Sequence, residues 1–68
     1  MKYVFREIRM QRAFLEARKF IEEHKENVLK TDMRCPISVE MNNGDIFLFM
    51  SYAVFSNWKL GRRDYKII

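Results

Sequence analysis

The dipeptide Asn43-Gly44 constrains the fold most, because it stands between two segments with strand character. Residues 37–41 alternate apolar and polar side chains, and residues 46–50 are a continuous apolar run. Asn-Gly favours a two-residue type I′ turn, in which both central residues need a positive φ. We therefore predict a β-hairpin with its loop at Asn43-Gly44. This register places six apolar residues on one face, pairing Met41 with Ile46, Val39 with Leu48 and Ile37 with Met50.

The opposite face of this hairpin carries two aromatic residues, Phe47 and Phe49. Either the C-terminal segment folds over them, which makes 46–50 a central strand, or they are exposed. Exposed rings at these positions would stack on nucleic-acid bases or anchor a protein partner.

A long amphipathic helix is predicted for residues 5–29, which contain neither Gly nor Pro. At about 100° per residue its apolar side chains fall within a single arc. The members of this arc are Met10, Ala13, Phe14, Ala17, Phe20, Ile21, His24 and Val28. We expect this seam to pack on the chain's own sheet. The alternative is a seam shared with a second copy, which would make a homodimer.

Charge along the predicted helix runs against its dipole. The first part holds Arg6, Arg9, Arg12, Arg18 and Lys19, and the second part holds Glu22, Glu23 and Glu26. Acids are favoured near a helix N-terminus and bases near its C-terminus. Ile8 and Leu15 lie away from the apolar seam, flanked by Arg12 and Lys19. An apolar spot among positive charges is typical of a protein-docking surface.

The C-terminal part is predicted less sharply. Residues 52–60 form either a short helix, with Gly61 at its end, or an extension of the preceding strand. Arg62 and Arg63 then make a basic turn before a last short strand at 65–68. The expected fold is a single α+β domain spanning 1–68, with one long N-terminal helix packed on a small antiparallel sheet.

Catalytic chemistry is not expected. One Cys and one His cannot make a metal cluster or a nucleophilic triad, and two glycines do not make a phosphate-binding loop. We expect His24 to be a hydrogen-bonded core histidine and Cys35 to be a small, buried or half-buried thiol. The sequence therefore predicts no enzyme, no metal and no cofactor.

Cysteine content and hydropathy bear on the compartment. A short secreted domain usually carries several cysteines, so the lone Cys35 indicates a reducing, cytoplasmic environment. No apolar stretch has the length of about 20 residues that a membrane span needs. The segment after Met1 has no apolar h-region, so we expect no signal peptide and a complete small reading frame.

The sequence favours a small interaction protein, a regulator or inhibitor of the kind that phage and mobile elements carry. It would dock on a larger protein such as a nucleic-acid enzyme. The predicted partner-binding residues are Arg6, Ile8, Arg9, Arg12, Leu15, Lys19, Phe47, Phe49, Trp58, Arg62 and Arg63.

Two alternatives stay open. A structural subunit would use the helix seam and the last strand. A nucleic-acid binder would use the net charge of +4. Its phosphate contacts would be Arg6, Arg9, Arg12, Lys59, Arg62, Arg63 and Lys66, with Phe47, Phe49 or Trp58 stacking on bases.

Overall fold

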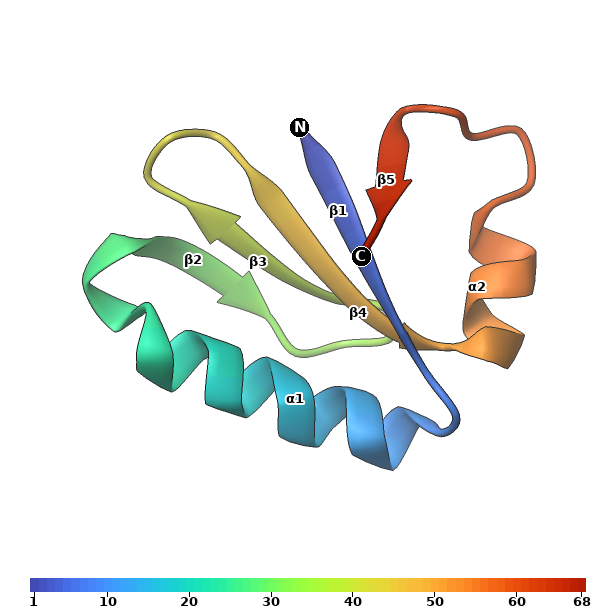
Figure 1. Ribbon diagram of the computed structural model, residues 1–68, viewed down its shortest axis with the longest axis horizontal. Helices are drawn as coiled ribbons and strands as arrows, with labels where there is room; N and C mark the ends of the chain where they lie inside the picture. The colour runs from blue at the N-terminus through green and yellow to red at the C-terminus, as the bar shows by residue number, and fades with distance from the viewer.

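A computed structural model describes all 68 residues and shows an α+β fold with two helices and a five-stranded sheet (Figure 1). In chain order the elements are β1 (Lys2–Glu7), α1 (Met10–Glu23), a 3₁₀ turn η1 (Lys25–Asn27), β2 (Val28–Asp32), β3 (Ile37–Met41), β4 (Ile46–Ser51), α2 (Tyr52–Trp58) and β5 (Tyr65–Ile67). Neither helix is long and apolar enough to cross a membrane.

The sheet is mixed, in the order β2-β3-β4-β1-β5. β3 runs antiparallel to both β2 and β4, whereas β1 is parallel to both β4 and β5. The expected purely antiparallel sheet is therefore wrong. The last strand is confirmed as β5, but it pairs with the first segment of the chain instead of the hairpin.

The expected helix over 5–29 is too long at both ends. Tyr3, Val4 and Phe5 favour strands, and they belong to β1, where Val4 is fully buried. At the other end α1 stops at Glu23, and Val28 already pairs with Met41 in the sheet. The amphipathic character is confirmed for α1 itself.

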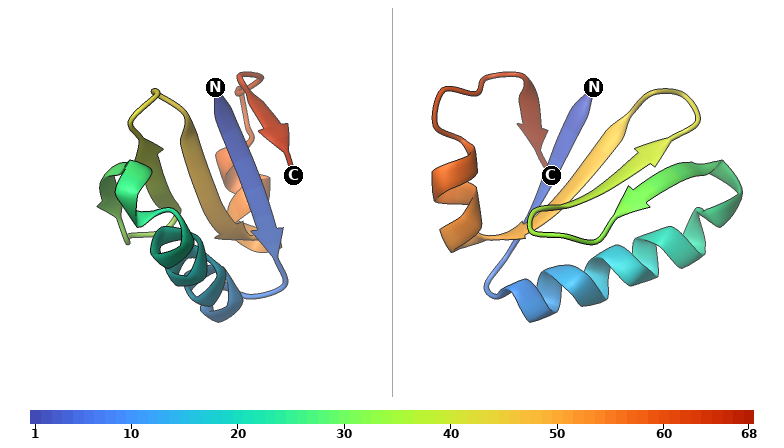
Figure 2. Two further views of the ribbon diagram at one scale, coloured as in Figure 1. Left: turned by 60° about the vertical axis from the view of Figure 1, so that its left-hand side comes forward. Right: turned by 180° about the vertical axis from the view of Figure 1, so that it is seen from behind.

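The two helices cover opposite faces of the sheet (Figure 2). Ala13 and Ala17 are fully buried, because small side chains let α1 approach the sheet closely. The apolar seam of α1 thus packs on this chain's own sheet, against a core cluster of Ile37, Val39, Met41 and Phe49. On the other face, Phe55 of α2 packs with Val4, Leu48 and Met50.

The hairpin loop is confirmed, but the predicted register is wrong by one residue. Ile37 lies opposite Phe49 and Val39 opposite Phe47. The loop has three residues, 42–44, and only Gly44 has a positive φ, of 93°. This is a turn closed by a glycine bulge instead of a type I′ turn. β4 is apolar on both faces, so its pattern could not discriminate between the two registers.

The position of β4 in the sheet explains why it carries aromatic rings, Phe47 and Phe49, on the face that the sequence left unexplained. It lies between β3 and β1, and is therefore a central strand, as one of the two alternatives predicted. α1, not the C-terminal segment, covers Phe47 and Phe49.

Residues 52–58 are helical, which decides between helix and strand. Ser51 caps α2, since its Oγ accepts the Val54 N–H at 3.1 Å. Beyond α2, Gly61 adopts a positive φ of 74° and redirects the chain toward β5.

Candidate functional site

The predicted partner-binding residues separate into three places and do not form one surface. One group meets where β1 turns into α1 and contains Ile8, Arg9, Arg12 and Leu15. A second group lies around α2 and the segment before β5 and contains Arg6, Trp58, Arg62 and Arg63. Phe47 lines a pocket near the hairpin loop. The other two do not join these groups. Phe49 is only 1% exposed and belongs to the core, and Lys19 lies at 3.8 Å from Glu16 on α1.

The first place is a shallow groove that we call the α1-start groove. Its lining residues are Glu7, Ile8, Arg9, Gln11, Arg12 and Leu15. Ile8 is 77% exposed and Leu15 is 45% exposed, so no strand covers them. The sequence placed Ile8 and Leu15 beside Arg12 and Lys19 and left open whether another segment covers them. The structure leaves both apolar side chains exposed, and it brings Arg9 and Arg12, but not Lys19, into their groove.

Electrostatics make this groove receptive to negative charge. Arg9 is the N-cap of α1 and offers no side-chain cap, and the first turn contains no acidic residue. The free N–H groups and the helix dipole therefore add to the positive charges of Arg9 and Arg12. Arg12 has one weak partner, Glu16 at 3.5 Å. Glu7 is the carboxylate that lines the groove itself.

The second place, which we call the α2–β5 surface, combines cations with aromatic rings. The Arg6 guanidinium lies 5.3 Å from the Tyr52 ring centroid and 5.2 Å from that of Phe55. Arg62 lies 4.9 Å from the Trp58 centroid and donates to the Trp58 carbonyl oxygen at 2.7 Å. Arg6 therefore belongs here and not with Arg9 and Arg12, because strand residues alternate between faces.

Positive charge is concentrated on the same part of the chain. Residues 52–68 hold +3 of the net +4, from Lys59, Arg62, Arg63 and Lys66 against Asp64. The carboxylate of Asp64 accepts a hydrogen bond from Lys2 Nζ at 2.9 Å, which lowers the pKa of Asp64 below its ordinary value of 3.8.

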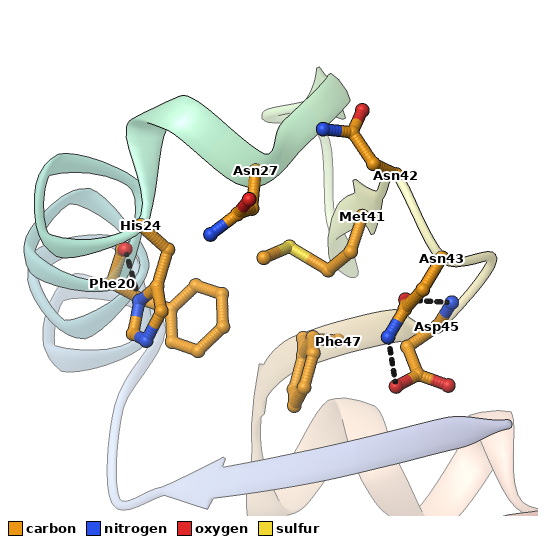
Figure 3. A pocket seen from close by; sticks show the side chains of 8 residues that line it. All are labelled: Phe20, His24, Asn27, Met41, Asn42, Asn43, Asp45 and Phe47. Atoms are coloured by element: carbon orange, nitrogen blue, oxygen red, sulfur yellow. Dashed lines mark hydrogen bonds between the residues drawn. The ribbon is translucent and has the colours of Figure 1, made fainter.

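The third place is a cavity of about 290 Å³ between the end of α1 and the hairpin loop, which we call the ring pocket (Figure 3). Its lining residues are Phe20, His24, Asn27, Met41, Asn42, Asn43, Asp45 and Phe47. The sequence predicted Phe47 as a functional residue and missed the others. The run Asn42-Asn43-Gly44-Asp45 was a signal for them, since a loop this rich in amides also brings hydrogen-bonding groups to a surface.

His24 and Cys35 are not where the sequence placed them. Both side chains are exposed. His24 ends α1, and its Nδ1 lies 2.9 Å from the Phe20 carbonyl oxygen. Since a carbonyl can only accept, Nδ1 must carry the hydrogen. The predicted hydrogen bond of His24 is therefore present, but the predicted core position is wrong.

No group of three or more His, Cys, Asp or Glu side chains has a metal-binding arrangement. No protein-family model matches the chain, and neither the curated proteins nor the solved structures contain a significant match.

Proposed function

We propose that this chain is a small, non-catalytic regulator or inhibitor that docks on a larger protein through the α1-start groove. The observation that carries the proposal is the exposure of Ile8 and Leu15, at 77% and 45%, in one groove with Arg9 and Arg12. Exposed apolar side chains bordered by arginine are typical of the centre of an interface.

The chemistry of the groove specifies its partner. An apolar segment would cover Ile8 and Leu15, and a flanking carboxylate would meet Arg9, Arg12 and the free N–H groups of the first turn. Bases at a helix N-terminus destabilise an isolated helix by roughly 0.3–1 kcal/mol each. A partner carboxylate would reverse this penalty upon binding.

The required contact area extends beyond the groove. A stable complex buries about 800 Å² on each partner, and the whole chain exposes 4808 Å². The partner must therefore cover roughly a sixth of this protein, which includes the neighbouring exposed side of α1 with Arg18 and Lys19. The exposed, unpaired Cys35 supports a reducing, cytoplasmic location for the complex.

Affinity purification from the native host, with and without nuclease, tests this function. The double variant Ile8→Asp/Leu15→Asp is expected to lose a stoichiometric protein that the wild type retains after nuclease treatment. Leu29→Asp is the matched control, because Leu29 is 60% exposed on β2, away from the groove. Circular dichroism confirms that the variants fold. Equal recovery of the protein with both variants, or recovery of none with wild type, contradicts the proposal.

The charge concentration on the α2–β5 surface favours a second candidate function, binding of single-stranded nucleic acid. Each phosphate contact contributes about −0.7 to the slope of log affinity against log salt concentration. Arg63→Gln/Lys66→Gln should therefore make the slope about 1.4 less negative, as measured by fluorescence anisotropy. Arg18→Gln/Lys25→Gln, with its changes on α1 and η1, should leave it unchanged. A wild-type affinity that does not depend on salt contradicts this function.

A further inference from the structure

We propose that the ring pocket binds the planar base of an uncharged nucleoside. This site is separate from the α1-start groove and does not depend on docking of a protein there. Four features of the pocket support this ligand: its size, its aromatic wall, the free amide of Asn27 and its charge.

The size of the ring pocket and its aromatic wall suit a flat ring system. A volume of about 290 Å³ lies at the small end of ligand pockets, where one base fits and a larger cofactor does not. The wall is a continuous set of rings. Phe20 lies 4.7 Å from Phe47 and 4.2 Å from His24, between ring centroids, and Tyr3 stacks behind Phe47 at 5.0 Å. Stacking on such rings stabilises any nucleic-acid base, because every base has a π-face.

The polar groups suit the edge of a base. Figure 3 shows the Asn27 amide directed into the space between His24 and Met41, and this side chain has no hydrogen-bond partner within the chain. An amide offers a donor and an acceptor side by side, which is the pattern needed for a bidentate contact to a base edge. A purely apolar ring would leave the exposed Asn27 amide to water instead of contacting it.

Two contacts hold the pocket in shape before a ligand arrives. The amide of Asn43 donates to the Asp45 carboxylate at 3.2 Å, and its carbonyl oxygen accepts the Asp45 backbone N–H at 2.9 Å. The bond from His24 Nδ1 to the Phe20 carbonyl orients the imidazole and leaves Nε2 as an acceptor in the neutral ring. Such prior ordering lowers the entropic cost of binding.

Charge excludes a phosphate from the same place. The ring pocket is lined by no Lys or Arg, and its one carboxylate, Asp45, is paired with the N-terminal ammonium of Met1 at 3.5 Å. A neighbouring depression shares His24 and Asn27 with it and adds Glu22, Glu23, Glu26 and Lys25, so that carboxylates outnumber cations there. A phosphate attached to the base would meet these carboxylates. The ligand is therefore a nucleoside or free base, which distinguishes this site from the cationic α2–β5 surface.

NMR titration of the ¹⁵N-labelled protein tests the proposal. Adenosine, cytidine, uridine and inosine are added separately, and at least one should give saturable shifts of the Asn27 and Asn43 side-chain amides. The expected dissociation constant is about 0.1 mM for a ligand of this size. Adenosine monophosphate should bind more weakly than adenosine. Indole, a flat ring with a single N–H donor, should bind at least about fivefold more weakly than the best nucleoside.

Two substitutions connect the shifts to the pocket. Asn27→Ala should weaken nucleoside binding at least about fivefold, and His24→Ala should weaken it about tenfold. Both side chains are exposed, so the fold should persist, which the amide spectrum verifies. Leu60→Ala, beyond α2, is the control and should bind as the wild type does. Four results overturn the proposal: no saturable shift at millimolar nucleoside, tighter binding of the monophosphate, indole equal to the best nucleoside, or Asn27→Ala equal to the control.

Discussion

Replacing Phe49 with alanine tests the hairpin register and the core at once. Phe49 is 1% exposed and stacks on Phe5, with ring centroids 4.6 Å apart and planes 3° from parallel. Phe20 of α1 lies 5.6 Å from it. In a register shifted by one residue, this ring would leave the face that Ile37 and Val39 share.

The structure gives the magnitude of the loss. Removing a fully buried Phe costs about 3–5 kcal/mol, whereas a 68-residue domain has a total stability of about 3–10 kcal/mol. Phe49→Ala should therefore lose at least about a third of the unfolding free energy. Phe47, which is half-buried, should lose only about 1–2 kcal/mol as Phe47→Ala. Phe49→Leu keeps most of the volume and should cost less than about 1.5 kcal/mol.

Urea denaturation followed by far-ultraviolet circular dichroism measures these differences. The expected order of stability is wild type, then Phe49→Leu and Phe47→Ala, then Phe49→Ala. Equal losses below about 1 kcal/mol for the two alanine variants would place Phe49 at the surface and refute the register.

Three further changes follow from local geometry. Ser51→Ala removes the cap of α2 and should lower the unfolding free energy by about 1 kcal/mol, as measured by urea titration. Ser56→Ala is the control, at an exposed site on the same helix, and should change this free energy by less than about 0.5 kcal/mol. Gly44→Ala should lower the unfolding free energy by about 1–2 kcal/mol, because alanine disfavours the φ of 93°. No atom lies near the added Cβ, so a steric clash does not contribute. An unchanged melting temperature would contradict that backbone conformation. The lowered pKa of Asp64 means that the folded state binds this proton less readily than the unfolded chain. Its contribution to stability is therefore present above pH 3.8 and is lost as the pH falls below that value. Lys2→Gln should flatten this acid dependence, which melting curves at several pH values would show.

Local patterns predicted the parts of the fold that depend on neighbouring residues. The seam of α1 and the hairpin loop that contains Gly44 follow from spacing of a few residues, and both are found. The first strand depends on pairing across most of the chain. Tyr3, Val4 and Phe5 have strand propensity, but no Gly or Pro separates Phe5 from the helical spacing that begins at Met10, so the predicted helix started too early.

The same distinction holds for the candidate sites. Arg12 and Leu15 share a groove because helical periodicity brings them together, and that could be read from the sequence. Ile8 joins them from the bend between β1 and α1. Arg6 and Phe49 were misplaced because their positions depend on the alternation of β1 and on the register of β4. The role of the groove in binding a partner stays a prediction.

The central position of β1 has a consequence for how the chain folds. Lys2 lies opposite Ile46 and Tyr65, which are 44 and 63 positions away in the sequence. Contacts of such long range must overcome a large loop-closure entropy, so we expect slower folding than for a helical protein of this size. Until β1 docks, the apolar β4 has an unpaired edge that can recruit another chain. Crowding and high concentration should therefore lower the folding yield through this strand, even where the native protein is stable.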